Sequence, residues 1–267
     1  MSDILINKVK QLLSDKAIDI FIGHGEGTGG RIRPIFVRTP EDAEQLIFNE
    51  NCKQSWANYL LKPEVKAAGK IGMMATKHAL RAMMQLASEF QIKDNEVLAL
   101  YWDNNELKSS ADFKEIEAYL ASQNHDILPH EQEMIDKLNA MTTQERWDFW
   151  QKEYEKCIKC YACRSACPMC YCHHCAAEGN QPQWIPVASH QLGNMDWHLM
   201  RAMHLSGRCI NCGACAKVCP MHIPLNLLTY NLITPIQQEF GAIAGMKHDA
   251  TYALSTFKTE DKENFIL

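Results

Sequence analysis

The chain has 267 residues, 46% of them hydrophobic, which is enough to bury a core in one large domain or two small ones. Its net charge of -5 gives it no basic surface, so we expect neither nucleic acid nor an anionic membrane as a partner. The first residues lack a cationic head followed by an apolar stretch, and no stretch of about 18 residues is free of charges or breakers. We therefore expect a cytoplasmic protein with no membrane span.

Helix and strand patterns alternate through the N-terminal part of the chain. Apolar periodicity predicts helices over 4–13 and 76–90 and strands over 18–22, 32–37, 70–74 and 96–101. Thr39-Pro40-Glu41-Asp42 predicts a further helix start, because a capping hydroxyl precedes a proline at the first helical position. We interpret residues 1–108 as a small α/β domain.

A polar, helical pattern follows this predicted domain. Trp147 and Trp150 lie one helical turn apart in residues 109–156, and we interpret this segment as a connector whose aromatic side chains pack on the next domain. Residues 157–232 form a cysteine-rich domain, and residues 233–267 are predicted to be a tail that lies over the surface.

The cysteines are the most informative residues of the sequence. Of the 12 cysteines, all except Cys52 lie between Cys157 and Cys219. In a chain with no export signal, this density at metal-ligand spacing indicates metal binding rather than disulfide bonds.

Two cysteine runs have the C-x-x-C-x-x-C-x-x-x-C-P spacing of bacterial ferredoxins. The first three thiols of each run bind one [4Fe-4S] cluster. The fourth thiol is too far along the chain to reach the same cluster and binds the other one. The predicted ligands of cluster I are Cys157, Cys160, Cys163 and Cys219, and those of cluster II are Cys209, Cys212, Cys215 and Cys167. The predicted fold class is thus α+β: a small α/β domain, a helical connector and a bacterial-type dicluster ferredoxin domain.

Paired C-x-x-C units also occur in zinc ribbons, which is the alternative for these runs. Zinc requires neither the third cysteine nor the proline after the fourth, and both features occur twice here. We therefore favour two [4Fe-4S] clusters, placed close together by the exchange of their fourth ligands.

The insert between Cys167 and Cys209 carries His190, His198 and His204. Residues 195–205 have the spacing of an amphipathic helix, which indicates a cover packed on the clusters. We interpret the histidines as part of this cover rather than as metal ligands.

Four cysteines remain outside the two predicted clusters. Cys170, Cys172 and Cys175 lie within six residues, too densely for chance packing of inert thiols, and Cys52 lies far upstream. They could hold a third [4Fe-4S] cluster or a zinc ion, with Cys52 or His174 as the fourth ligand. Alternatively, the three thiols line the cluster environment and Cys52 is a core residue.

The segments around the second run resemble a known group of proteins. Residues 196–208 and 221–225 look like the dicluster subunits found with heterodisulfide-reductase-like, hydrogenase and formate dehydrogenase complexes of anaerobes. Residues 22–52 and 69–82 are similar to the beta-subunit family of coenzyme F420 hydrogenases and dehydrogenases. Members of that family are electron carriers that commonly bind a flavin beside a cluster, so the resemblance implies a flavin such as FAD in the N-terminal domain.

A glycine-rich segment, Gly23 to Gly30, contains a G-x-G-x-x-G match. A dinucleotide-binding fingerprint must open a helix, whereas these glycines lead into a predicted strand, so we reject that interpretation. Two interpretations remain open: a hairpin loop, or a flavin contact made by Gly25, Gly27, Gly30, Arg31 and Arg33.

The leading functional hypothesis is an electron-transfer subunit of an anaerobic oxidoreductase complex, without catalytic residues of its own. Its expected partners are other subunits of that complex and a ferredoxin-like or flavin electron donor or acceptor. The alternatives are a flavin-containing oxidoreductase of the F420 hydrogenase beta-subunit type and a redox-sensing or assembly module.

Overall fold

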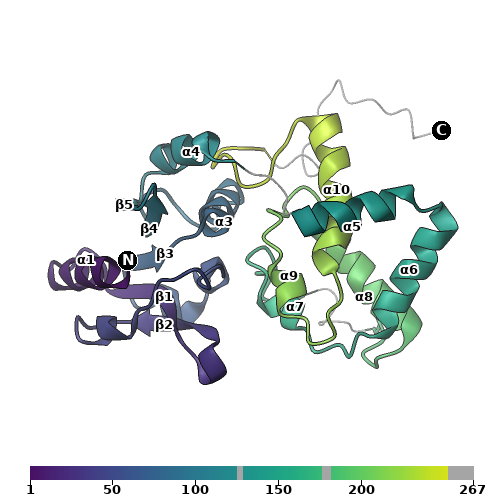
Figure 1. Ribbon diagram of the computed structural model, residues 1–267, viewed down its shortest axis with the longest axis horizontal. Helices are drawn as coiled ribbons and strands as arrows, with labels where there is room; N and C mark the ends of the chain where they lie inside the picture. Colours follow the sequence, from purple (N-terminus) through teal and green to yellow (C-terminus); the bar gives the residue numbers. More distant parts are fainter. Residues whose placement is uncertain (125–128, 176–181, 252–267) are drawn as a thin grey trace.

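The computed structural model describes residues 1–124, 129–175 and 182–251. Its ribbon has two lobes, one built around a five-stranded sheet and one built of helices and the cysteine runs (Figure 1). The predicted combination of an N-terminal sheet and a helical C-terminal part is confirmed. No helix in the three described ranges has the length and hydropathy needed to cross a bilayer.

The sheet has the strand order β2-β1-β3-β4-β5. Its centre is parallel and consists of β1 (Ile20–Glu26), β3 (Ile71–Met74) and β4 (Val97–Asp103). The edge strands β2 (Ile32–Val37) and β5 (Glu106–Ser110) pair antiparallel with β1 and β4. Parallel central strands are covered on both faces, which explains their nearly continuous apolar sequences.

Helices cover the two faces of the sheet. Phe21 packs in the core formed with α1 (Ser2–Ser14), whereas Ile22 packs in the opposite core with α3 (Lys77–Ser88) and α4 (Phe113–Ser122). This follows from the strand period of two, which sends successive side chains to opposite faces. The predicted end of the first domain at residue 108 falls inside β5, and α4 shares the core of the sheet.

Two local predictions differ from the structure. The helix predicted at Thr39 is only a 3-10 turn, η2 (Asp42–Gln45), because the chain becomes extended at Leu46 and the Ile47 N–H donates to the carbonyl of His24 at 2.9 Å. Strand β5 was not predicted. Its signal is the pair Asn104-Asn105, which turns the chain with φ values of 47° and 68°.

The second lobe is built from four longer helices. They are α5 (Pro129–Ala140), α6 (Thr143–Glu155), α8 (Gln191–His204) and α10 (Leu225–Phe240). Two short helices, α7 (Ala162–Ser165) and α9 (Ala214–Lys217), complete the described part of this lobe. The sheet-containing lobe also has short helical segments, which are η1 (Thr28–Gly30), η3 (Ala57–Tyr59) and α2 (Pro63–Lys66).

Aromatic stacking joins α6 to α8. Trp150 stacks on Tyr154 with ring centroids 5.7 Å apart, and Tyr154 stacks on His198 at 5.0 Å. Trp150 therefore packs against the cysteine-rich part as predicted, whereas Trp147 is 44% exposed. The predicted helix over 195–205 is confirmed as part of α8.

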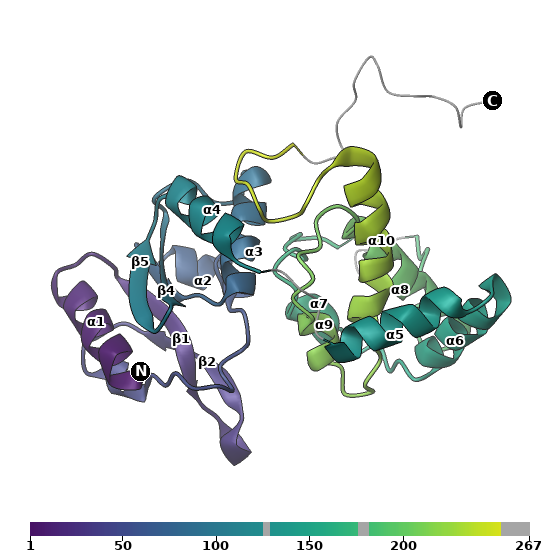
Figure 2. The same cartoon turned by 45° about the horizontal axis from the view of Figure 1, so that its top comes forward.

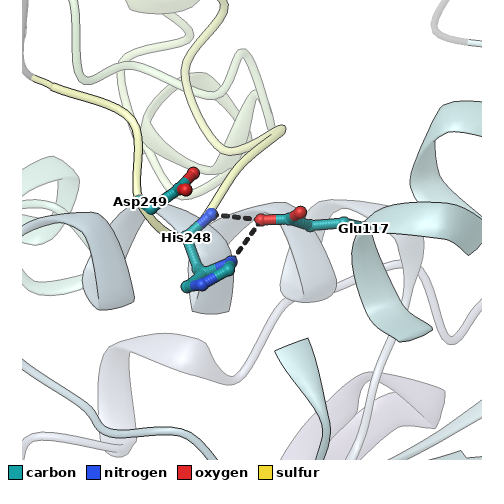
Figure 3. Close-up of side chains that lie close together, drawn as sticks. All are labelled: Glu117, His248 and Asp249. Carbon is teal, nitrogen blue, oxygen red and sulfur yellow. Dashed lines mark hydrogen bonds and ion pairs between the residues drawn. The ribbon is translucent and has the colours of Figure 1, made fainter. Parts of the chain in front are cut away.

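The chain returns to the first lobe after α10, and both views show residues 241–251 running back to α3 and α4 (Figures 1 and 2). This C-terminal segment is held by specific bonds. The Gly245 N–H donates to Gln85 at 2.9 Å, and Glu117 accepts from the backbone N–H of His248 and contacts its ring (Figure 3). Part of the predicted tail is therefore α10 and this segment, while residues 252–267 lie outside the described residues.

Candidate metal centre

The two cysteine runs have the same backbone conformation. Lys159 and Tyr161 in the first run have φ values of 51° and 57°, and the equivalent Asn211 and Gly213 in the second have 53° and 67°. Left-handed residues at these two positions curl each loop tightly before the short helix that follows it. The repeat in sequence is thus a repeat in structure.

Backbone N–H groups in both loops point at cysteine sulfurs. The N–H of Lys159 donates to Sγ of Cys157 at 3.3 Å, and that of Asn211 donates to Cys209 two residues before it. Hydrogen bonds to ligand sulfurs are one of the determinants of cluster potential.

Eight cysteines line two separate cavities. The first cavity is lined by Cys157, Cys160, Cys163 and Cys219, and the second by Cys167, Cys209, Cys212 and Cys215. The fourth cysteine of each run therefore lies with the first three of the other run. These are the two sets that the spacing predicted, and we call them the first set and the second set.

None of these thiols forms a disulfide; Cys157 and Cys163 are buried, Cys160 is exposed, and the other five are half-buried. Burial raises the pKa of Cys163 and Cys157, and it raises the pKa of Cys212 to about 12. A metal deprotonates a coordinating thiol outright and supplies the positive charge that a buried thiolate needs. Groups of four thiols that line one cavity and receive backbone N–H donors fit a metal cluster.

The spacing of the sulfurs bears on the size of that cluster. A tetrahedral zinc site with Zn–S bonds of about 2.3 Å holds its sulfurs about 3.8 Å apart. Within the described residues, Glu117, His248 and Asp249 bring three possible ligand atoms within 4.8 Å of one another. In the described part of the chain, no three sulfurs of either set lie that close together. No three of these described sulfurs therefore lie at the spacing of a single zinc ion.

Comparison with known proteins agrees with this geometry. Residues 156–224 match the family model described as the 4Fe-4S dicluster domain. This segment of the chain is therefore similar to a 4Fe-4S dicluster domain, and we call it the dicluster domain. The expected iron–sulfur character is therefore confirmed.

Two curated relatives extend the likeness. The chain is 37% identical over 100 residues to the F420-dependent formate dehydrogenase subunit beta of Methanocaldococcus jannaschii, covering 36% of this chain and 25% of the relative. It is 33% identical over 105 residues to the F420-dependent formate dehydrogenase 1 subunit beta of Methanococcus maripaludis, covering 39% and 26%. The matches thus span about a quarter of the length of these relatives.

Cys170 shares a hydrogen bond with Cys167 beside the second set of the dicluster domain. This bond lowers the pKa of Cys167 and raises the pKa of Cys170.

The dicluster domain contacts the sheet-containing lobe at the second set. Cys209 and Cys212 pack against the core that contains Ala82 and Leu86 of α3. Next to them, Glu89 accepts two hydrogen bonds from Arg208, one of them at 2.7 Å. The second set therefore lies between the two lobes, whereas the first lies within the helical lobe.

Helix α8 carries two polar side chains beside the cavities, of which the sequence predicted one, His198, as part of the cover. His198 is 2% exposed and lines the first cavity, and burial lowers its pKa to about 3, so it is neutral. Arg201, which was missed entirely, is 7% exposed and lines the second cavity. The available signal was its position on the apolar face of an amphipathic helix, one turn after Trp197 and His198.

Of the four cysteines left outside the two predicted clusters, the structure brings three to one cavity and leaves Cys52 apart. Cys170, Cys172 and Cys175 line a cavity of about 870 Å³ between α3, α8 and the C-terminal segment. Cys52 is not among the residues of that cavity. Its buried thiol donates locally to the Ile47 carbonyl at 3.8 Å and to Asn49 at 3.6 Å.

The glycine-rich segment forms the hairpin between β1 and β2. Gly25 pairs with Arg33 across the hairpin, and Arg33 also donates to the carbonyl of Glu26 at 2.9 Å. Gly30 has a φ of 70°, and Gly27 and Arg31 close the turn by a backbone hydrogen bond at 2.6 Å. A flavin contact at these residues remains a prediction.

Proposed function

We propose that this chain is an electron-transfer subunit of an oxidoreductase complex and relays single electrons through two [4Fe-4S] clusters. The observation that carries the proposal is the pair of adjoining cavities, each lined by four cysteines and each completed by the other run. A [4Fe-4S] cluster supplies reversible one-electron exchange when bound.

The protein's own groups prepare both cavities for this role. The exchange of Cys167 and Cys219 ties the two loops together, so neither cavity keeps its four thiols without the other loop. Short helices α7 and α9, which follow the loops, also contact each other. A rigid double loop keeps the distance between the two cavities constant, which favours electron transfer between them.

We propose a formate-dehydrogenase-like complex as the setting, because both curated relatives are named as subunits of such enzymes. The partners would be the other subunits and a ferredoxin-like or flavin carrier. No arrangement of nucleophile and base in the described residues suggests a reaction catalysed by this chain itself.

Anaerobically purified protein should contain about eight iron atoms, and its reduced form should show magnetic coupling between neighbouring clusters. Cys219→Ser should damage the cluster held mainly by the first run, and Cys167→Ser the cluster held mainly by the second. Cys170→Ser is the matched control, since it lies beside Cys167 but outside both sets, and it should keep both clusters.

Iron content and electron paramagnetic resonance of these variants decide the outcome. Iron near zero with stoichiometric zinc would rule out the relay. If each of the two ligand variants harmed only the cluster of its own run, the crossed ligation would be wrong.

A further inference from the structure

Two arginines from different lobes lie beside the second set. Arg201 comes from α8 of the helical lobe, and Arg81 comes from α3, which packs on the sheet. In each guanidinium, Nε is buried and has no hydrogen-bond partner among the described residues. Such an orphaned donor in a protein interior is costly unless another group satisfies it.

Arg201 lies between the two cavities and contacts both runs. Its Nη2 donates to the carbonyl of Cys163 at 3.1 Å, and its guanidinium hydrogen-bonds the sulfur of Cys167. Its charge interacts with Cys215 of the second set and, less strongly, with Cys163 of the first set. It therefore touches one predicted ligand of each cluster, and its hydrogen bond to a ligand sulfur is to Cys167 of the second set.

Arg81 approaches the second set from the other side. Its charge interacts with Cys209 and Cys212, and its Nη2 donates to the carbonyl of Ala244 at 2.7 Å. The C-terminal segment thus holds this side chain in place, and the sheet-containing lobe contributes a positive charge to the dicluster domain.

The first set has a cation of its own beside it, Lys159. This residue is buried next to Cys157, its ammonium donates to the carbonyl of Pro186, and its charge interacts with Cys157 but also with the carboxylate of Asp196, which offsets it. The other polar neighbour is the neutral imidazole of His198. The electrostatic surroundings of the two sets are therefore unequal.

Reduction of a cluster adds one negative charge, so a nearby buried cation stabilises the reduced form and raises the reduction potential. We propose that Arg201 and Arg81 raise the reduction potential of the cluster held by the second set above that of the cluster held by the first. An electron that enters the protein then rests on the second cluster, beside the sheet-containing lobe. This inference rests on the proposed function, since it requires both clusters.

The test is a redox titration of the anaerobic holoprotein, followed by electron paramagnetic resonance, in the wild type and the variants Arg201→Met, Arg201→Lys and Arg81→Met. Arg146→Met is the matched control, because Arg146 also donates to a backbone carbonyl but lies on α6. Cys212→Ser assigns the signal of the second cluster.

In the wild type, the second cluster should be reduced first. Arg201→Met should move the equilibrium of an electron between the two clusters at least tenfold toward the first cluster, which corresponds to about 59 mV in the difference between their potentials. Arg201→Lys keeps the positive charge and should therefore show a smaller shift. Arg81→Met should shift the equilibrium in the same direction, whereas Arg146→Met should leave it unchanged.

Full iron with unchanged potentials in Arg201→Met and Arg81→Met would overturn the inference, as would an equal shift of both clusters. If Arg201→Met fails to load iron, Arg81→Met decides alone, because Arg81 touches neither run through a hydrogen bond to its backbone. Iron missing from the wild type would instead refute the proposed function, so the two failures are distinguishable.

Discussion

The contact between the two lobes depends on the carboxylate of Glu89. It accepts hydrogen bonds from Arg208 Nε at 2.7 Å, from Arg208 Nη2, from the Tyr171 hydroxyl at 2.5 Å and from the Gln85 amide at 2.8 Å. Arg208 also lies over the ring of Tyr171, 5.3 Å from its centroid. We expect Glu89→Ala to destabilise the protein strongly, because one substitution removes the acceptor of all four bonds.

The size of the effect follows from burial. The side chains of Glu89 and Arg208 are 9% and 15% exposed, so the substitution leaves a largely buried guanidinium without its counter-ion. Removing one partner of a buried pair costs about 3–5 kcal/mol, and the remaining exposure places this loss near the lower end, about 3 kcal/mol. With a urea m-value of about 2–3 kcal/mol per M, the unfolding midpoint should fall by about 1–1.5 M.

Urea unfolding of the anaerobic holoprotein, followed by tryptophan fluorescence, measures this midpoint. Glu44→Ala is the control, since Glu44 is also paired with a cation, Lys10, but is 65% exposed. Exposed pairs contribute about 0–1 kcal/mol, so the control should change the midpoint little. Equal midpoints for Glu89→Ala and wild type, or an equal loss in both variants, would refute the reasoning.

The same contact predicts a pH dependence. Burial alone raises the pKa of Glu89, but the hydrogen bonds from Arg208 and Tyr171 and the charge of Arg208 outweigh it and hold the pKa below its ordinary value of 4.5. A carboxylate with a lowered folded pKa stabilises the fold above its unfolded pKa and loses this effect as the pH falls through the folded value. The advantage of wild type over Glu89→Ala should therefore be complete near neutral pH and shrink below about pH 4.5.

Two further predictions concern the C-terminal segment and the leftover cysteine. Gly245→Ala should loosen the C-terminal segment, because Gly245 has a φ of 74° and a Cβ there would lie 2.3 Å from the carbonyl oxygen of Arg81. A protease should therefore cleave this variant faster than the wild type. Gly241→Ala is the control and should change the cleavage rate much less, because Gly241 has a similar φ of 65° but no atom of the described residues within 4 Å of the added Cβ. Cys52→Ala should leave the iron and zinc content of the holoprotein unchanged and cost about 1 kcal/mol of stability through the lost bond to Asn49, whereas a loss of metal would show that Cys52 is a ligand after all.

Local sequence patterns determined the main elements of the sheet-containing lobe. The alternation of apolar residues located β1, β3 and β4, and Thr76 marked the start of α3 by accepting a hydrogen bond from the Ala79 N–H at 3.2 Å. These features depend on neighbours along the chain, so the sequence carries them directly. The helix predicted at Thr39 was wrong for the opposite reason, since a hydrogen bond to the distant His24 extends the chain there.

The sequence by itself also predicted which cysteines line the same cavity, because ligand spacing within a short loop follows from the reach of a few residues. Only the tertiary structure decided what surrounds them. In the structure, Cys52 does not line the cavity that Cys170 lines, and Arg201 and Arg81 lie beside the second set. Burial and charge around a site depend on contacts between residues far apart in the chain, and local spacing does not encode them.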